Sequence, residues 1–140
     1  MERNNGLTKL LIGAIAAVGL GSVNRSYGEN NEYFGSTSND QRYLKQLDPS
    51  ACSVEDIGDT GLFTFGADST SDRKLYHIGR LGGTGPFKLA QIDTIDGLIL
   101  NIIDFPETEA IAFDPRNNND LYFIHNYTTL KKFNMTSSPH

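Results

Sequence analysis

The stretch from Ala110 to Ile124 reads AIAFDPRNNNDLYFI, and a weaker copy of it lies 46 residues earlier in the chain. Four positions are identical at this shift: Asp114 with Asp68, Leu121 with Leu75, Tyr122 with Tyr76 and Ile124 with Ile78. Farther along, Phe133 falls on Phe87 without a gap. A self-match with a period of roughly 40–50 residues indicates a repeat architecture in which each repeat is one small sheet. Such a scaffold does not by itself reveal a ligand.

Short runs of β-type composition follow one another from Gly61 onward, separated by turn residues. They predict seven strands: Leu62–Ala67, Lys74–Ile78, Phe87–Ile92, Leu98–Phe105, Ala110–Phe113, Leu121–His125 and Thr129–Phe133. The pair Asp96-Gly97 is typical of a tight hairpin turn between the third and fourth of these strands. We therefore expect residues 61–140 to form an all-β, antiparallel meander of one four-stranded unit and a partial second unit.

The repeat also makes a prediction about register. Leu75 and Leu121 should point to the same face of their sheets, and so should Ile78 and Ile124, because side chains alternate between faces along a strand. The loops at 68–72 and 117–120 should then lie at the same end of the two sheets.

Three stretches carry a family resemblance: KLAQIDTIDGLILNIIDF at 88–105, AIAFDP at 110–115 and LYFI at 121–124. Over about 61–134, the chain resembles secreted β-propeller repeat proteins. It keeps the family's Ile-Asp at 92–93, Gly97, the Phe-Asp-Pro at 113–115 and the Leu-Tyr at 121–122. It departs from the family at Asp96, where Thr is usual, and at 103–104, where Ile-Gly is usual. The resemblance implies propeller-like blades and carries over no functional residue, because such propellers include enzymes, ligand binders and adhesion modules.

Residues 1–28 read as a signal peptide. Arg3 and Lys9 precede an uncharged, mostly apolar run from Leu10 to Val23, with small residues near Gly21 and Gly28 that suit a cleavage site. The alternative is a retained amphipathic or membrane-anchoring helix. No second apolar stretch approaches the length of a membrane span. The sequence predicts a secreted or periplasmic protein without a membrane segment after cleavage.

Residues 29–60 read as a polar, flexible linker, because Asn, Ser, Gly and Glu dominate its first part. A short helix is predicted from Ser38 to Leu47, with Ser38 as N-cap and Gln41 completing a capping box. Tyr43, Leu44 and Leu47 would then share one helical face, and Pro49 would end the helix.

The formal net charge is −5, and the chain has no basic cluster. Nucleic acid and anionic lipid are therefore not expected as partners. Cys52 is the only cysteine, which excludes an internal disulfide. A buried or unreactive thiol is the main expectation for Cys52, and pairing with another chain is the alternative.

Each loop that resembles a known site has a simpler explanation as a turn. The oxygen-rich segment 114–120 lacks the glycine and terminal glutamate of a calcium loop and reads as a strand connection. The glycine-rich segment 79–85 lacks the Lys-Ser/Thr ending of a phosphate loop, and Pro86 should open a strand. Asp93, Asp96 and Asp104 read as solvated carboxylates around a hairpin, without the spacing that selects a glycosidase pair.

His77, His125 and His140 are too scattered for a metal signature, and His125 reads as a satisfied core or rim histidine. No motif pairs a nucleophile with a base. The sequence thus predicts no catalytic, cofactor-binding or metal residue, and it favours an exported, non-catalytic binding or adhesion module with an unknown ligand. The alternative is the amino-terminal part of a secreted propeller enzyme of lactonase or glycosidase type, inactive alone.

The incomplete second unit would leave blade faces and edges uncovered, because propellers need several blades to close. Two explanations stay open: a truncated piece of a longer gene, which we favour, or self-association through the exposed edges and faces. Asn126 and Asn134 lie in glycosylation sequons, which matter only in a eukaryotic source.

Overall fold

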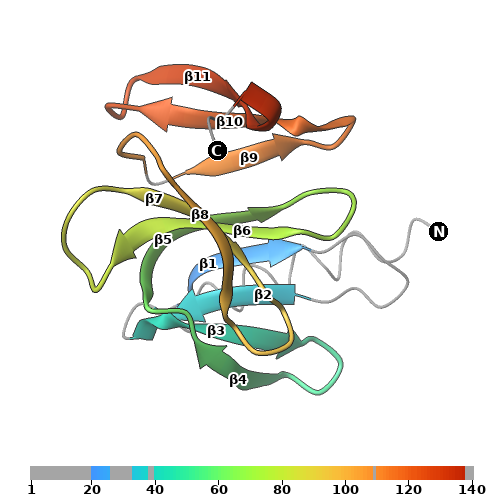
Figure 1. The fold of residues 1–140 in the computed structure, drawn as a ribbon. Coiled ribbons are helices and arrows are strands. Elements are labelled where there is room, and N and C mark those ends of the chain that lie inside the picture. Colours follow the sequence, from blue (N-terminus) through green and yellow to red (C-terminus); the bar gives the residue numbers. More distant parts are fainter. Residues whose placement is uncertain (1–19, 26–32, 38–39, 109, 138–140) are drawn as a thin grey trace.

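The computed structural model describes residues 20–25, 33–37, 40–108 and 110–137. Within these ranges the chain is built from short antiparallel strands and one 3₁₀ turn (Figure 1). The elements are β1 (Leu20–Arg25), β2 (Tyr33–Thr37), β3 (Asp40–Asp48), β4 (Ser53–Asp59), β5 (Leu62–Ser69), β6 (Leu75–Leu81), β7 (Lys88–Ile92), β8 (Ile99–Asp104), β9 (Ile111–Asp114), β10 (Asn117–His125), β11 (Thr129–Asn134) and η1 (Met135–Ser137).

The strands form three sheets in chain order: sheet A (β1–β4), sheet B (β5–β8) and sheet C (β9–β11). In each sheet every strand pairs with its neighbour in sequence, so each sheet is a simple meander. The all-β prediction is confirmed, including the four strands of sheet B and the three strands of sheet C. Their bounds differ from the expected ones by at most four residues, and the largest difference is at the start of β10, Asn117.

Sheet A was not expected from the sequence. The prediction of a linker with a helix over 29–60 is wrong for the described residues, because β2, β3 and β4 lie there. The segment proposed as a helix is instead β3, which pairs with both β2 and β4. Leu44 of β3 and Phe34 of β2 are buried against sheet B, and this tertiary burial outweighs the local helical pattern.

Most of the predicted signal peptide lies outside the described residues. The exception is Leu20–Arg25, which forms β1 and pairs with β2. No helix in the described part of the chain has the length and apolar character needed to cross a membrane.

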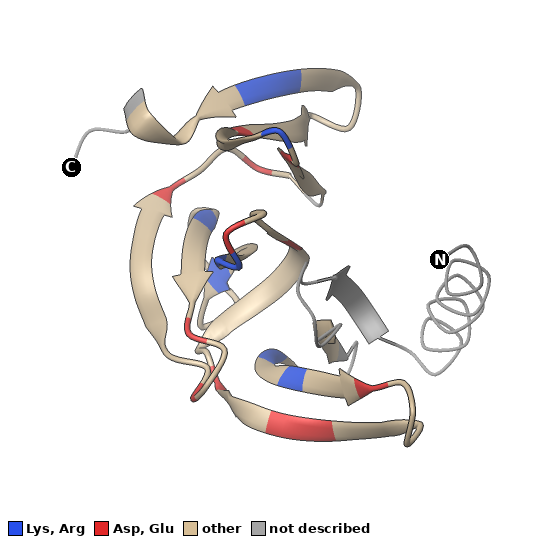
Figure 2. Ribbon diagram, turned by 90° about the vertical axis from the view of Figure 1, so that its right-hand side faces the viewer, with Lys and Arg blue, Asp and Glu red and all other residues tan. Residues whose placement is uncertain are grey.

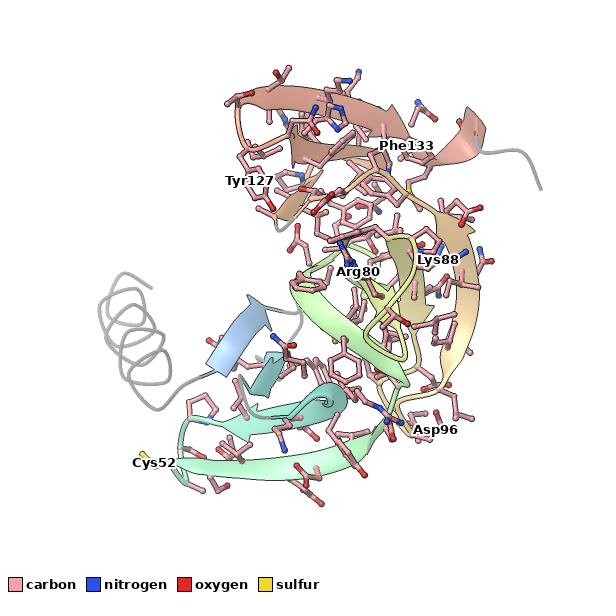
Figure 3. All side chains as sticks on the ribbon, turned by 90° about the vertical axis from the view of Figure 1, so that its left-hand side faces the viewer. Cys52, Arg80, Lys88, Asp96, Tyr127 and Phe133 are labelled. Carbon is pink, nitrogen blue, oxygen red and sulfur yellow. The ribbon has the colours of Figure 1, made fainter. Side chains whose placement is uncertain are left out.

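The three sheets are arranged radially, with their first strands close together on one side of the molecule. The first strands of the sheets lie on that side, where β1 runs beside β5 and β5 beside β9, while β4, β8 and β11 lie farthest from it (Figure 3). This radial stacking of small meanders, each sheet packed face to face on the next, is the arrangement of propeller blades.

The two sheet-to-sheet interfaces have separate cores. Between sheets A and B the buried side chains are mainly aliphatic: Phe34, Leu44, Leu62, Leu75, Ala90 and Ile92. Between sheets B and C aromatic rings dominate: Ile78, Phe87, Leu89, Phe105, Ile111, Phe113, Leu121 and Phe123. Ring pairs such as Tyr76–Phe113, with centroids 5.0 Å apart, join the second interface.

Sheet A is also held to sheet B by a close backbone approach. A Cβ on Gly58 of β4 would lie 2.0 Å from the carbonyl oxygen of Asp96, in the β7–β8 turn. Gly97 of that turn has φ of +76° and faces Gly58 in return. Glycine is therefore required at both positions, for space at Gly58 and for space and conformation at Gly97.

The predicted register of the second strand is confirmed. Leu75 packs against sheet A and Leu121 against sheet B, so each points toward the preceding sheet. Ile78 and Ile124 lie on the opposite face of their strands. Ile78 is fully buried by sheet C, whereas Ile124 is 36% exposed.

The repeat does not extend through the other strands as expected. Phe133 pairs with Leu121, while Ile92 pairs with Leu75, so the counterpart of Phe133 is Ile92 and the match with Phe87 is accidental. The Leu75–Ile92 pair encloses 16 residues and the Leu121–Phe133 pair encloses 11, and these five additional residues in sheet B shift the third strand.

The first strand is shifted as well. Tyr76 lies opposite Asp68, but Tyr122 lies opposite Ala112. Asp114 is therefore two residues beyond the counterpart of Asp68.

Candidate binding end of sheets B and C

Three connections meet at one end of sheets B and C: β6–β7, β8–β9 and β10–β11. We call this the Tyr127 end, and Figure 3 views it with Arg80 and Tyr127 labelled. The β5–β6 and β9–β10 connections lie at the opposite end. The first contains Ser71, and the second is followed by Asn118 in β10, so we call this end the Asn118 end.

Arg80 is the last but one residue of strand β6 and lies at the Tyr127 end. Its guanidinium carbon lies 4.6 Å from the centroid of the Phe87 ring, and its Nη2 lies 3.6 Å from Oε1 of Glu107. Its Nε atom is buried without a hydrogen-bond partner in the structure. Arg80 thus combines a cation–π contact and a loose, partly exposed ion pair with unused donor capacity.

His125 ends β10 on the face that packs against sheet B. Its ring meets Phe123 edge-on, with centroids 6.4 Å apart, and Phe123 in turn contacts Phe105. The Nδ1 atom of His125 is buried and has no hydrogen-bond partner in the structure. The expectation of a satisfied rim histidine is therefore wrong for this nitrogen, and a single sequence holds no signal that would have shown it.

Tyr127 is the middle residue of the three-residue β10–β11 connection. Asn126 and Tyr127 have φ of 49° and 61°, and the amide of Thr128 donates to the carbonyl of His125 at 3.3 Å. Two successive left-handed residues define a type I′ hairpin, in which the second position favours glycine. A tyrosine there is strained and 68% exposed, so local stability does not explain its presence.

The Asn118 end is tied together by hydrogen bonds between sheets B and C. The amide and hydroxyl of Ser71 both donate to Oδ1 of Asn118, at 2.9 and 2.7 Å. The amide of Phe113 donates to Oδ2 of Asp68 at 2.6 Å. These bonds confirm that the loops at 68–72 and 117–120 lie at the same end, although 117–120 belongs to β10.

The strand connection expected over 114–120 is shorter in the structure: Asp114 ends β9, only residues 115–116 form the turn, and β10 begins at Asn117. The amide of Arg116 donates to Oδ1 of Asp114 at 2.9 Å, which is the local bond that closes an Asp-Pro turn. Among the described residues no group of three or more His, Cys, Asp or Glu side chains could hold a metal ion.

The other hairpin turns also agree with the sequence. Asp93 accepts from the amide of Ile95 at 2.8 Å, and Asp96 accepts from the amide of Leu98 at 2.9 Å. Asp104 forms an ion pair with Lys88 across the strands. The glycine-rich segment leads into strand β7, so no helix N-terminus follows it.

His77 is the buried histidine of sheet B. Its Nδ1 lies 3.0 Å from the Thr64 hydroxyl, its Nε2 has no partner in the structure, and burial lowers the pKa of His77 to about 4. The ring is therefore neutral at physiological pH. It packs between sheets A and B, away from the Tyr127 end.

Cys52 is exposed at the tip of the β3–β4 turn, with φ of 52°. The thiol is therefore not buried, while the expectation that it is unreactive stays a prediction. Asn126 is exposed at the Tyr127 end, whereas the side chain of Asn134 reaches Asp120 and Thr136.

No protein-family model matches the sequence, and no curated protein matches it. Solved structures do match the fold. A luciferin-regenerating enzyme superposes with a TM-score of 0.56 at 15% identity, covering 75% of this chain and 36% of that protein. The hydrazine synthase of Kuenenia stuttgartiensis superposes with a TM-score of 0.53 at 13% identity, covering 76% of this chain and 29% of that protein.

These similarities concern the fold alone. The luciferin-regenerating enzyme is a propeller-type protein with antiparallel sheets, and the three stacked meanders of this chain follow the same plan. The chain spans about a third of the length of the structures it matches.

Proposed function

We propose that the chain is part of an exported, propeller-type binding module that holds its ligand at the Tyr127 end. The observation that carries the proposal is the strained, exposed Tyr127 at the same end as the unpartnered nitrogens of Arg80 and His125. Strained backbone conformations cluster at ligand-binding sites, where the strain serves the function.

The side chains at this end suit a saccharide. The exposed ring of Tyr127 offers a flat apolar surface, while Glu107, Arg80 and Asn126 offer the acceptors and donors that hydroxyl groups require. Because Arg80 lies near the end of β6 and Glu107 lies in the β8–β9 connection, a ligand that contacts both would reach from sheet B to the link with sheet C.

The experiment measures binding of the purified chain to a panel of immobilised neutral and acidic oligosaccharides. Tyr127→Gly should weaken binding at least about tenfold while leaving the fold intact, because Asn-Gly is the preferred type I′ pair. Ile95→Ala, at a highly exposed site in the β7–β8 turn, is the matched control and should bind like the wild type. If the wild type binds no member of the panel, or Tyr127→Gly binds equally well, the proposal fails.

The alternative is that the chain belongs to a propeller enzyme. The similarity to the luciferin-regenerating enzyme supports it, although 15% identity transfers no residue roles. We expect the chain alone to hydrolyse neither simple lactones nor aryl glycosides. Activity that survives repurification and is lost in Glu107→Gln or His125→Ala would favour the enzyme.

Export rests on the basic and apolar amino-terminal residues. We propose cleavage near Gly21 in preference to Gly28, because cleavage after Gly28 would remove β1 from sheet A. The intact mass of the secreted product distinguishes the two sites. An uncleaved product that retains Met1 and stays inside the cell would contradict export.

We further propose that this chain is a portion of a larger ring, as the coverage of 36% and 29% of the matched proteins suggests. Sequencing the gene downstream of the codon for His140 tests this directly: further β-meander repeats are expected.

A further inference from the structure

Arg80 binds its neighbouring carboxylate less completely than Arg42 does. The Nε and Nη2 atoms of an arginine donate in the same direction, and together they can bind both oxygens of one carboxylate as a fork. Arg42 binds Asp59 in this way, with distances of 3.2 Å from Nε and 2.6 Å from Nη2. Arg80 has only the 3.6 Å contact of its Nη2 with Glu107, and its Nε is buried without a partner.

Solvent exposure does not explain the half-empty fork of Arg80. The side chain of Arg116 is 88% exposed and still forms the fork with Asp114, at 3.2 and 3.4 Å. The side chain of Arg80 is only 34% exposed, and its Nε is out of reach of bulk water. A buried donor of a charged group is costly when it has no acceptor. We therefore expect a group from outside the chain to complete this fork.

The guanidinium of Arg80 is held in position before any ligand arrives. Arg80 alternates with Tyr76 and Ile78 along β6, on the face that packs against sheet C, and Figure 3 shows it pointing from sheet B toward sheet C. Its stacking on the Phe87 ring restricts the side chain further. A planar group that is already oriented loses little freedom when it forms two parallel hydrogen bonds.

We propose that the ligand of the Tyr127 end is an acidic saccharide, and that its carboxylate binds both Nε and Nη2 of Arg80 in place of Glu107. The inference rests on the proposed function and narrows the saccharide to one that contains a uronic acid. Glu107 is 54% exposed in the β8–β9 connection, so its side chain has room to turn into solvent when the ligand carboxylate enters. His125 faces sheet B at the same end, and its unpartnered Nδ1 is available to a further polar group of the ligand.

The first test compares ligands that differ only in charge. Calorimetry measures binding of the chain to trisaccharides of galacturonic and glucuronic acid and to the methyl esters of the same compounds. At least one acid should bind about tenfold more tightly than its ester, because hydrogen bonds between charged groups are the stronger ones. This preference should shrink as the salt concentration rises.

The second test uses variants of the two charged residues. Arg80→Lys keeps the positive charge and loses the fork, so it should remove most of the preference for the acid and leave the affinity for the ester within about twofold. Glu107→Gln removes the competing carboxylate and should raise the affinity for the acid roughly two- to fivefold, a gain that misfolding cannot produce. Glu55→Gln is the matched control. It removes one negative charge from the acidic stretch of β4, at the bottom of Figure 2, and should change neither affinity.

Equal affinities for acids and esters would overturn the inference while leaving the proposed saccharide function in place. The inference also fails if Glu107→Gln binds the acid no better than the wild type does. An equal gain in Glu55→Gln would contradict it too, since the overall charge of the chain would then account for the effect. If neither acids nor esters nor any neutral saccharide binds, the proposed function itself is lost.

Discussion

Sheets B and C carry the same residues at the centre of their second strands and bury them differently. Tyr76 and Ile78 of sheet B are covered by sheet C, and the Tyr76 ring contacts Phe113. Tyr122 and Ile124 occupy the matching positions of sheet C, and Ile124 stays partly exposed. The repeated residues therefore specify a strand and its register, while the neighbouring sheet decides how much each side chain contributes to stability.

The strongest test of this comparison is the pair Ile78→Ala and Ile124→Ala. The first removes a fully buried side chain from the B–C core and should cost about 3–4 kcal/mol of unfolding free energy, whereas the second should cost less than about 1 kcal/mol. Urea denaturation monitored by circular dichroism measures both. Equal losses would mean that a further sheet already covers Ile124 in solution.

The second test concerns the residue between Tyr76 and Ile78. His77 of sheet B occupies the position of Phe123 in sheet C. Because burial lowers the folded pKa of His77 to about 4 from 6.5, the unfolded chain takes up the proton first as the pH falls below 6.5. The free energy of unfolding should drop by about 2 kcal/mol between pH 7 and pH 5.

His77→Gln, which does not titrate, should lose most of this dependence. Asp68 works in the other direction: burial raises its pKa, so its protonation favours the folded state as the pH falls. An unchanged pH profile in His77→Gln would show that another group controls it.

Sheets B and C could be predicted from the sequence, whereas sheet A could not. The β-branched and aromatic runs in β5 to β11 fit half-buried strands without further information. In β3, by contrast, Tyr43, Leu44 and Leu47 satisfy both a helical face and a strand, and only pairing with β2 and β4 decides between them. The acidic β4 shows no apolar alternation at all.

Local turn chemistry was predictable and the candidate site was not. The bonds of Asp93, Asp96 and Asp114 to nearby amides follow from residue type alone. The grouping of Arg80 with Glu107, and the unpartnered nitrogen of His125, depend on how two sheets pack. Of the candidate site, only Tyr127 is conspicuous in the sequence, because it follows Asn126 in a tight hairpin turn, where glycine is the preferred residue after asparagine.

A third test breaks the link between the two first strands at the Asn118 end. Asp68→Ala leaves the amide of Phe113 without its acceptor and should cost about 1–2 kcal/mol. Asp68→Asn keeps an acceptor and removes a buried charge, so its unfolding free energy at pH 7 should lie within about 0.5 kcal/mol of the wild type. Chemical denaturation at pH 7 compares them. An Asn variant as unstable as the Ala variant would assign the role to the charge instead of the hydrogen bond.

The smallest expected effect is at the opposite end, where sheet C has a tight turn and sheet B a longer glycine-rich loop. Tyr127→Gly should raise the unfolding free energy by about 0.5–1 kcal/mol, because glycine adopts a φ of 61° without strain. A small rise in the melting temperature would show it. A loss of stability would mean that the Tyr127 ring packs within the folded chain, which would also weaken its proposed role in binding.

The strictly sequential order of strands has a consequence for synthesis on the ribosome. Each sheet closes by consecutive hairpins, so every pairing within it joins neighbouring segments, and such local contacts form quickly. Sheets A, B and C can thus form in the order in which they emerge. The aromatic layer between B and C assembles last, and until then Ile78 and Phe87 of an otherwise finished sheet lie open to chaperones.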